Sequence, residues 1–339
     1  MPVVVTEYLE MEYRDYGSPE DKVILLVHGW PDDASTWDEV APALVAKGFR
    51  VVVPTLRGFG NTRFVNDTVS RTGNSAVLAL DIIALMDSLA IDRFMVVGHD
   101  WGSNTVEALA VGWPRRVERM AMLSTPPRLG GAPTPPFEQA QRQWYHWFMA
   151  TQRAAEAIRA DRRGFTHFHW KNWSPAGWFD EATFERVASS FDNPDWVEVT
   201  LHSYRARWDE ANPDPASQWL EDKVKATKTL SLPALYIQGT VDGVNPPSST
   251  TTVPEKFTGP FAMIQLAGVG HFPQRENPRA LVQHLLSLFD GDPSTLTAKT
   301  DRSLPIKRKG PLVAGIVAAG IVATALFRTS RRQKSAPSD

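Results

Sequence analysis

Runs of consecutive apolar residues alternate with amphipathic stretches over the first part of the chain. The runs are 23–27 (VILLV), 50–54 (RVVVP) and 94–98 (FMVVG). Continuous apolar runs of this length are typical of strands buried on both faces. Residues 36–47 and 74–89 have the spacing of crossover helices, and residues 3–16 alternate as antiparallel edge strands do. This order predicts an α/β fold with a mostly parallel sheet covered on both sides.

The pattern changes near residue 127. Residues 127–228 lack a run typical of a buried strand, open on a Pro- and Gly-rich stretch and hold eight of the 12 tryptophans. We therefore predict a helical cap inserted over the sheet. Strand patterns return at 233–239 and 261–266, followed by a helix at 278–289. The expected domains are a first core part at 1–126, a cap at 127–228 and a second core part at 229–290.

The residues after 290 form a third kind of sequence. Residues 291–310 are polar and predict a linker, whereas 311–327 (PLVAGIVAAGIVATALF) carry no charge and have basic residues on both sides. At ~1.5 Å per residue such a helix spans about 25 Å, close to the ~30 Å of a bilayer core. We predict a C-terminal apolar tail helix that anchors the protein in a membrane. The N-terminus has no secretory signal pattern, so we expect the catalytic domain to face the cytoplasm.

Composition and charge exclude several functions. The chain has 36 basic and 38 acidic residues, a balance that argues against binding nucleic acid mainly through charge. It has no cysteine, which excludes disulfides, a thiolate nucleophile and Cys-ligated zinc. No phosphate-binding glycine loop or dinucleotide motif is present, so no cofactor is expected. His167 and His169 form a pair without an evident third ligand, so no metal is expected either.

Three residues at strand ends form a candidate catalytic triad. Asp100 is the centre of GHDWG, which follows the run 94–98 and precedes a helical stretch, as in a nucleophile elbow. Asp242 follows the run 233–239, and His271 follows 261–266. Nucleophile, acid and histidine occur in this order in the fold that uses such an elbow. We predict the triad Asp100, His271 and Asp242.

The loop HGWP after the run 23–27 is the expected oxyanion-hole loop. The backbone N–H groups of Trp30 and Trp101 are predicted to point at a developing negative oxygen. The residues expected to contact substrate are His28, Trp30, Trp101, His146 and Trp147.

Five motifs together resemble one enzyme family. In order they are HGWP, LRGFG, GHDWG, GTVDG and GVGHF. Over about residues 8–290 the chain resembles the α/β-hydrolase-fold epoxide hydrolases and is similar to the haloalkane and haloacetate dehalogenases. Two features depart from that family: Thr55 stands where an aspartate is usual before LRGFG, and the tail after 290 has no counterpart.

An aspartate nucleophile restricts the chemistry. A carboxylate with a pKa of ~3.9 is ionised at neutral pH and needs no base to attack. Attack on a saturated carbon gives an alkyl ester, which water activated by His271 can hydrolyse. The expected substrates are therefore small apolar epoxides or halides, with water as co-substrate.

The cap tyrosines favour epoxides. Ring opening leaves an alkoxide that needs a proton donor, and tyrosine is neutral at pH 7. The resemblance implies two such donors: a tyrosine in a Trp-Tyr pair, here Tyr145, and one before an arginine, here Tyr204.

Two alternatives stay open. His146 and Trp147 with Tyr204 resemble the halide-holding group of haloacetate dehalogenases, but Trp101 and Asn104 replace the arginines that hold the substrate carboxylate there. Trp101 also matches a halide-binding indole of haloalkane dehalogenases, although Trp30 replaces their halide-binding asparagine. The second alternative is a membrane-tethered relative that binds a ligand without turnover.

Overall fold

The computed structural model describes residues 1–131, 134–296 and 299–301. The chain divides into two compact units, Met1–Arg308 and Lys309–Asp339. The predicted membrane segment 311–327 belongs to the second unit and lies outside the described residues. Within the described part of the chain, no helix is long and apolar enough to cross a bilayer.

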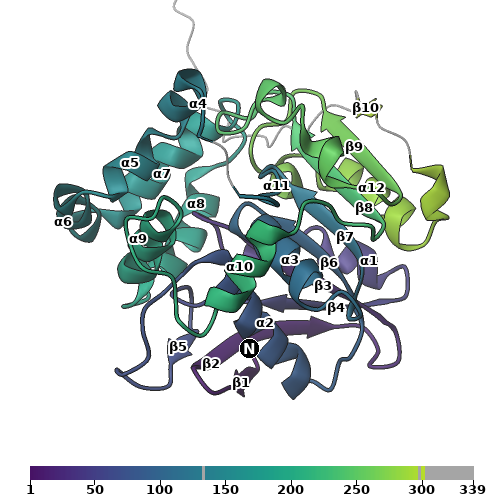
Figure 1. Ribbon diagram of the computed structural model, residues 1–339, viewed down its shortest axis with the longest axis horizontal. Coiled ribbons are helices and arrows are strands. Elements are labelled where there is room, and N and C mark those ends of the chain that lie inside the picture. The colour runs from purple at the N-terminus through teal and green to yellow at the C-terminus, as the bar shows by residue number, and fades with distance from the viewer. Residues whose placement is uncertain (132–133, 297–298, 302–339) are drawn as a thin grey trace, which may run out of the picture. The chain divides into compact units, whose positions relative to one another are not determined.

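A ten-stranded sheet forms the centre of the first unit (Figure 1). The strands are β1 (Val3–Val5), β2 (Leu9–Tyr16), β3 (Lys22–Val27), β4 (Phe49–Pro54), β5 (Arg63–Phe64), β6 (Phe94–His99), β7 (Val117–Leu123), β8 (Ala234–Gly239), β9 (Phe261–Leu266) and β10 (Lys299–Asp301). Their order is β1-β2-β4-β3-β6-β7-β8-β9-β10, with β5 paired to β2. From β4 to β10 neighbouring strands run parallel, whereas β1 and β2 pair antiparallel. The predicted parallel sheet with an antiparallel edge is confirmed.

Helices cover both faces of the sheet, and each face has its own apolar core. On one face Ile24, Val51 and Val97 pack with side chains of α1 and α12. On the other face Leu25 and Val96 pack with side chains of α2, α3 and the cap. The covering helices are α1 (Ala41–Val45), α2 (Ser75–Ser88), α3 (Trp101–Gly112), α10 (Gln218–Ala226), α11 (Pro273–Glu276) and α12 (Pro278–Phe289), with the 3₁₀ turn η1 (Ala34–Trp37).

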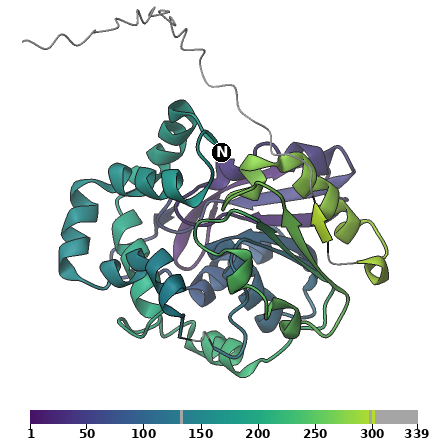
Figure 2. The same cartoon turned by 90° about the horizontal axis from the view of Figure 1, so that it is seen from above.

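The cap consists of short helices gathered to one side of the sheet (Figure 2). They are α4 (Phe137–Arg142), α5 (Trp144–Met149), α6 (Gln152–Ala160), α7 (Arg162–Trp173), α8 (Glu181–Ala188), the 3₁₀ turn η2 (Ser189–Asp192) and α9 (Trp196–Ala206). Polar residues start three of them: Thr151 accepts a hydrogen bond from Ala154 N, and Asp161 accepts one from Gly164 N. Asp180 does the same for Thr183 N in α8. These caps break the segment into short helices.

Polar contacts join the cap to the loops that follow β3, β4 and β5 of the core. Trp170 Nε1 donates to Pro31 O at 2.7 Å. Asn193 Nδ2 donates to three carbonyls of the loop after β4, among them Thr62 O at 2.8 Å. Arg71 Nε lies 3.0 Å from Asp195 Oδ1. The cap therefore rests on the loops that follow β3, β4 and β5.

Three sheet strands fall outside the sequence predictions: the two-residue β5, β7 and β10. Strand β7 was missed because Glu118 and Arg119 interrupt its apolar run at the half-buried end. Strand β10 and the 3₁₀ turn η5 (Pro293–Thr295) lie within the segment predicted as a polar linker. Lys299 pairs in parallel with Ile264, so this segment adds a strand to the sheet instead of leaving it. The remaining 3₁₀ turns, η3 (Pro247–Ser249) and η4 (Val253–Lys256), lie between β8 and β9.

Candidate active site

Asp100 occupies a strained turn between β6 and α3. Its backbone has φ 53° and ψ −112°, outside the regions that most residues adopt. The turn is crowded: a Cβ on Gly98 would lie 2.1 Å from Gly102 O, and one on Gly102 would lie 2.2 Å from Val27 O. Only glycine fits at these two positions. The predicted nucleophile elbow is thus present, and it projects the Asp100 side chain from the carboxyl end of the sheet.

The Asp100 carboxylate is buried, ionised and hydrogen-bonded. Trp30 N donates to Oδ1 at 2.9 Å, and Thr125 Oγ1 donates to Oδ2 at 3.3 Å. Burial alone would raise the pKa of Asp100, but the charged imidazole of His271, whose Nε2 lies 3.6 Å from Oδ2, and the N–H of Trp30 lower it to about 2. The group is therefore ready to attack without a base.

His271 links the two predicted carboxylates. Its Nδ1 lies 2.9 Å from Asp242 Oδ2, and its Nε2 lies 3.6 Å from Asp100 Oδ2. Asp242 is itself fixed, because its Oδ1 accepts from Val244 N at 2.7 Å and Asn245 N at 3.0 Å. Burial disfavours the charged imidazole, but Asp242 and Asp100 outweigh burial and raise the pKa of His271 to about 10. The structure brings the three predicted triad residues together.

The backbone of His271 is held by residues that sequence patterns did not indicate. Its carbonyl accepts from His99 Nε2 and from Ser124 Oγ, each at 2.8 Å. Its N–H lies 2.8 Å from Ser174 Oγ, a cap residue whose hydroxyl donates to Glu276 Oε1 at 2.6 Å. Burial lowers the pKa of His99 to about 4 and keeps that ring neutral. The loop that carries His271 is therefore fixed by both core and cap.

Of the two predicted oxyanion donors, the backbone N–H of Trp30 has a hydrogen bond to Asp100, and that of Trp101 lies at the start of a helix. Trp30 N already donates to Asp100 Oδ1. Trp101 is the first residue of α3, where backbone N–H groups have no partner within the helix. Its role as the second donor stays a prediction.

Both predicted tyrosines lie in the aromatic cluster above Asp100. Tyr145 comes from α5 and Tyr204 from α9, and their ring centroids are 5.4 Å apart. Trp30 stacks on Tyr145 at 6.0 Å, and Tyr204 lies 5.7 Å from the ring of Trp101. Burial and the Asp100 charge raise the pKa of each phenol well above its ordinary value. Both therefore keep their protons at every working pH.

Of the other residues predicted to contact substrate, His146 lines the cavity, whereas His28 and Trp147 do not. His28 has both ring nitrogens committed to backbone, since Nε2 accepts from Leu56 N at 3.1 Å and Nδ1 lies 3.2 Å from Gly29 O. That ring holds two loops together and has no hydrogen bond left for a substrate. His146 is buried at the cavity wall, and its Nδ1 accepts from Trp208 Nε1 at 3.2 Å. Trp147 is 41% exposed and packs on Trp208 outside the cavity lining.

A cavity of about 310 Å³ opens onto Asp100. Tyr145, His146 and Trp208 line it from the cap. Thr125 and Arg128 line it from the segment after β7, and Arg207 from the end of α9. Sequence patterns missed this second group. The carboxyl-end position of Thr125 and Arg128, directly after a parallel strand, was the signal that could have found them.

The described residues contain no group of three or more His, Asp or Glu side chains placed to hold a metal. His167 Nε2 instead lies 2.9 Å from Glu181, and His169 Nδ1 lies 2.7 Å from Phe165 O. The H-x-H pair therefore has local structural partners.

Comparison with known proteins gives one family match and several relatives. The alpha/beta hydrolase fold family matches residues 22–278. Epoxide hydrolase A of Mycobacterium tuberculosis is 25% identical over 316 residues, which cover 85% of this chain and 97% of the relative. A fluoroacetate dehalogenase of a Burkholderia species is 30% identical over 193 residues, which cover 54% of this chain and 62% of that protein.

Several solved structures are similar to this chain over more than nine-tenths of their own length. A proposed epoxide hydrolase from Klebsiella pneumoniae superimposes with a TM-score of 0.80 at 34% identity and covers 85% of this chain and 96% of its own. This similarity extends over both the sheet and the cap helices described above.

Proposed function

The chain belongs to the α/β-hydrolase fold family, and from this premise we propose that it is an epoxide hydrolase in which Asp100 attacks an epoxide carbon. The observation that carries this proposal is His271 lying between Asp242 and Asp100 beneath two buried tyrosines. The similar relatives that bear the name epoxide hydrolase support the same activity.

The first step is ring opening. One carboxylate oxygen of Asp100 forms a bond to an epoxide carbon while the carbon–oxygen bond of the ring breaks. The ring oxygen takes the electron pair, and Tyr145 and Tyr204 donate hydrogen bonds and a proton to it. Their raised pKa values keep them protonated donors. The product is a 2-hydroxyalkyl ester of Asp100.

The second step is hydrolysis of that ester. His271 takes a proton from water, whose oxygen attacks the Asp100 carbonyl carbon, and the amides of Trp30 and Trp101 stabilise the resulting oxyanion. Breakdown releases a vicinal diol, because the proton that His271 took from water passes to the departing oxygen. The proton of the new Asp100 carboxylic acid returns to the tyrosinate formed in the first step, which restores the carboxylate. Ester formation also removes the negative charge 3.6 Å from Nε2, and loss of that charge lowers the pKa of His271 from about 10. Once that pKa has fallen, the imidazolium of His271 releases its proton to solvent and becomes the base for the second step. It takes a proton up again when the carboxylate is restored.

Trapping the ester tests this proposal. His271→Gln should form the ester but hydrolyse it slowly, so intact mass spectrometry should find an adduct on the peptide that carries Asp100. An epoxide adds its whole mass, whereas a halide adds its mass less that of hydrogen halide. No adduct from a panel of epoxides, in a folded His271→Gln protein, would refute epoxide opening.

Dehalogenation is a second candidate function, favoured by one contact. The ring centroids of His146 and Tyr204 lie 4.9 Å apart, so both side chains could contact one halide ion. The indole N–H of Trp208 is already donated to His146. Halide release from organic halides, assayed beside the panel of epoxides, separates this function from epoxide opening.

We also propose that the uncharged segment 311–327 anchors the enzyme to a membrane. The support is its sequence alone: 17 uncharged residues with Lys307, Arg308 and Lys309 before them and Arg328 after them. An anchored enzyme would meet apolar epoxides where they dissolve.

A further inference from the structure

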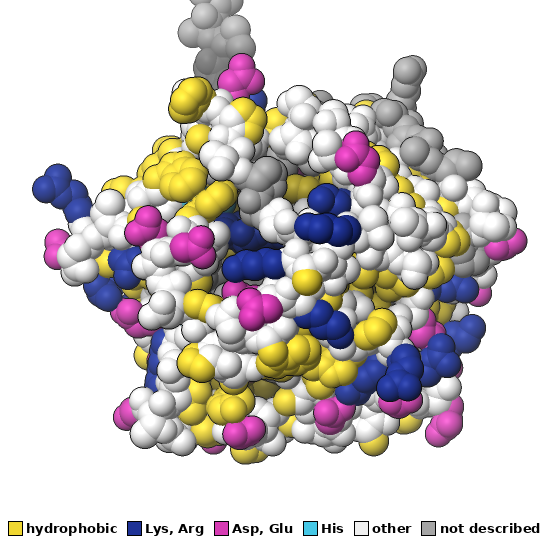
Figure 3. All heavy atoms as spheres, viewed as in Figure 1, with side chains coloured by type: hydrophobic (Ala, Val, Ile, Leu, Met, Phe, Trp, Pro, Cys, Tyr) yellow, Lys and Arg dark blue, Asp and Glu magenta, His cyan; other side chains and the backbone are white. Residues whose placement is uncertain are grey.

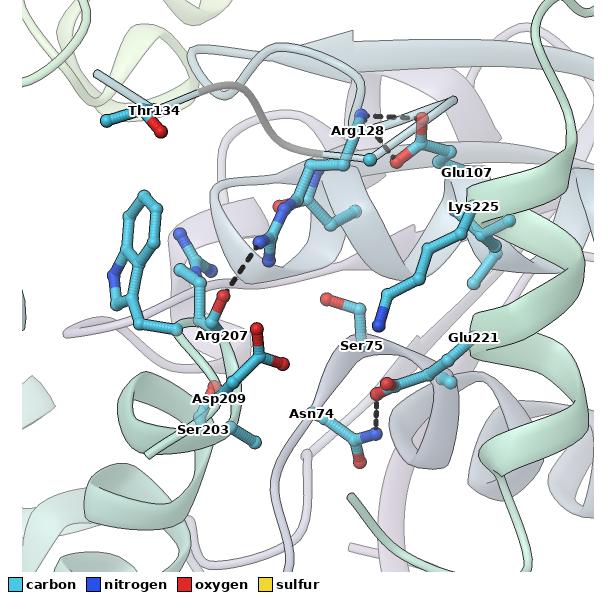
Figure 4. A pocket seen from close by; sticks show the side chains of 17 residues that line it. Asn74, Ser75, Glu107, Arg128, Thr134, Ser203, Arg207, Asp209, Glu221 and Lys225 are labelled. Carbon is cyan, nitrogen blue, oxygen red and sulfur yellow. Dashed lines mark hydrogen bonds between the residues drawn. The ribbon is translucent and has the colours of Figure 1, made fainter. Parts of the chain in front are cut away.

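A second cavity of about 370 Å³ adjoins the Asp100 cavity. Figure 4 shows it from close by, with side chains from α3, α9 and α10 around it. Asn104, Arg128, Thr134, Arg207 and Trp208 line both cavities. The two spaces therefore share a wall that holds two arginines. Figure 3 shows basic side chains gathered around a hollow beside α10.

Arg128 and Arg207 come from different layers of the fold. Arg128 follows β7 in the core, whereas Arg207 ends α9 in the cap. A hydrogen bond joins the two residues: the guanidinium Nη2 of Arg128 donates to the backbone carbonyl oxygen of Arg207 at 3.3 Å. Within the described part of the chain, no carboxylate lies within ion-pair distance of either guanidinium, and Arg207 Nε is buried without a hydrogen-bond partner. Two adjacent cations with unused donors form a site for an anion.

The acidic residues nearby do not occupy this site. Glu107 accepts from the backbone N–H groups of Arg128 and Leu129 at 2.8–3.0 Å, and burial raises its pKa to about 7. Glu221 accepts from Asn74 Nδ2. Asp209 is exposed at the edge of the outer cavity and its charge acts on Arg128, so we expect it to compete with a bound anion. Lys225 adds a further cation to the outer cavity.

The positive charge reaches the catalytic side of the wall. Burial and the charges of Arg207 and Arg128 hold the pKa of His146 well below its ordinary value. Burial and the charge of Arg207 lower the pKa of Arg128 to about 9, although the charges of Glu107, Glu221 and Asp209 act in the opposite direction. An anionic group bound there would relieve this repulsion.

We propose that Arg128 and Arg207 bind the carboxylate of an acidic substrate whose epoxide carbon reaches Asp100. This inference rests on the proposed function and names its substrate class: epoxides that carry a carboxylate at a fixed distance from the ring. A carboxylate accepts from planar guanidinium groups in paired geometry, which a neutral amide of the same shape does not match.

A matched substrate series tests the site. The probes are terminal epoxy-carboxylates of increasing chain length, each compared with its own primary amide. The wild-type protein should prefer the acid at one length, by about tenfold or more in kcat/KM. Arg128→Gln and Arg207→Gln should each reduce this acid-to-amide ratio by about tenfold, mainly through KM. Arg207→Lys should restore part of it.

Two further variants sharpen the result. Arg153→Gln removes an exposed cap arginine that lines neither cavity, and it should leave the ratio unchanged. Asp209→Asn removes the competing anion and should raise the ratio. A wild-type ratio near one at every length, or a ratio that survives both glutamine substitutions, overturns the carboxylate site.

Binding measured without turnover separates this inference from the proposed function. Saturated alkanoates and their amides, titrated by calorimetry into the full chain, report the carboxylate site alone. Alkanoate binding that Arg207→Gln weakens about tenfold supports the site even where no epoxide is opened. Epoxide turnover without alkanoate binding supports the proposed function and refutes the carboxylate site.

Discussion

His271 Nε2 lies 3.6 Å from Asp100 Oδ2. This single distance couples the two chemical steps, since each group changes the protonation of the other. While Asp100 is a carboxylate, it helps to keep the imidazole charged, and the charged imidazole keeps the pKa of Asp100 at about 2. Once Asp100 is an ester, its contribution to the charged imidazole is lost while that of Asp242 remains, and the imidazole can release its proton and act as a base.

Asp100→Ala should abolish turnover while the protein stays folded. The methyl group cannot form the ester, so we expect a loss of ~10⁴-fold or more in kcat. The measurement is epoxide hydrolysis, with circular dichroism and thermal unfolding as the fold control. Substantial activity in a well-folded Asp100→Ala protein would show that another residue is the nucleophile.

The two steps should depend on pH in different ways. Ester formation needs ionised Asp100, whose pKa of about 2 makes this step independent of pH from about pH 4 upward. Hydrolysis needs neutral His271, so its rate should fall as pH falls, with an apparent pKa below about 10. Rapid-quench mass spectrometry of the wild-type protein should therefore show the ester accumulating at acid pH. Equal pH dependence of both steps would contradict this coupling.

The tyrosines should matter for ring opening and not for ester hydrolysis. Tyr145→Phe and Tyr204→Phe each remove one donor to the alkoxide, and each should slow single-turnover ester formation by ~10²-fold. The double variant should nearly stop it. Hydrolysis of a preformed ester should keep its wild-type rate in both single variants. Wild-type ring opening in the double variant would remove both residues from the mechanism.

The sequence was sufficient to place the triad because each member follows a parallel strand, and such strands end at one edge of a sheet. It failed where a contact depends on how the cap meets the core. Arg207 ends a cap helix 79 residues after Arg128, and their hydrogen bond forms only in the folded protein. It also failed at His28, because the partners of both ring nitrogens are backbone atoms that no side-chain pattern reveals.

Thr55, the departure from the family motif, has a structural position in the fold. Its hydroxyl lies 3.3 Å from Glu12 Oε2, and its carbonyl accepts from Thr62 Oγ1 at 2.7 Å. The next residues carry a buried ion pair, in which Arg57 Nε and Nη2 each lie 2.6 Å from an oxygen of Asp81. The LRGFG motif therefore contributes a buried ion pair, through Arg57, that we expect to stabilise the fold next to the active site.

Breaking that ion pair should destabilise the fold strongly. Both side chains are almost fully buried, so Arg57→Met leaves an uncompensated carboxylate and should cost about 3–5 kcal/mol. Arg57→Met with Asp81→Leu should cost less, because no charge is left unpaired. Arg50→Met, which breaks the more exposed pair with Asp15, is the matched control and should cost under about 1 kcal/mol. Urea unfolding measures all three, and equal losses for Arg57 and Arg50 would contradict the argument.

Removal of residues 309–339 should release the enzyme from membranes and leave its chemistry intact. The cut follows Arg308 because the strand Lys299–Asp301 belongs to the sheet, and a cut before it would remove a strand. Full-length protein should fractionate with membranes and stay there in high salt and carbonate, since burial in lipid is not screened as charge attraction is. The double variant Ile316→Lys, Ile321→Lys places two charges in the uncharged run, and it should release the full-length chain from membranes as the truncation does. Release of the unaltered chain by salt alone would show that the tail binds only at the membrane surface.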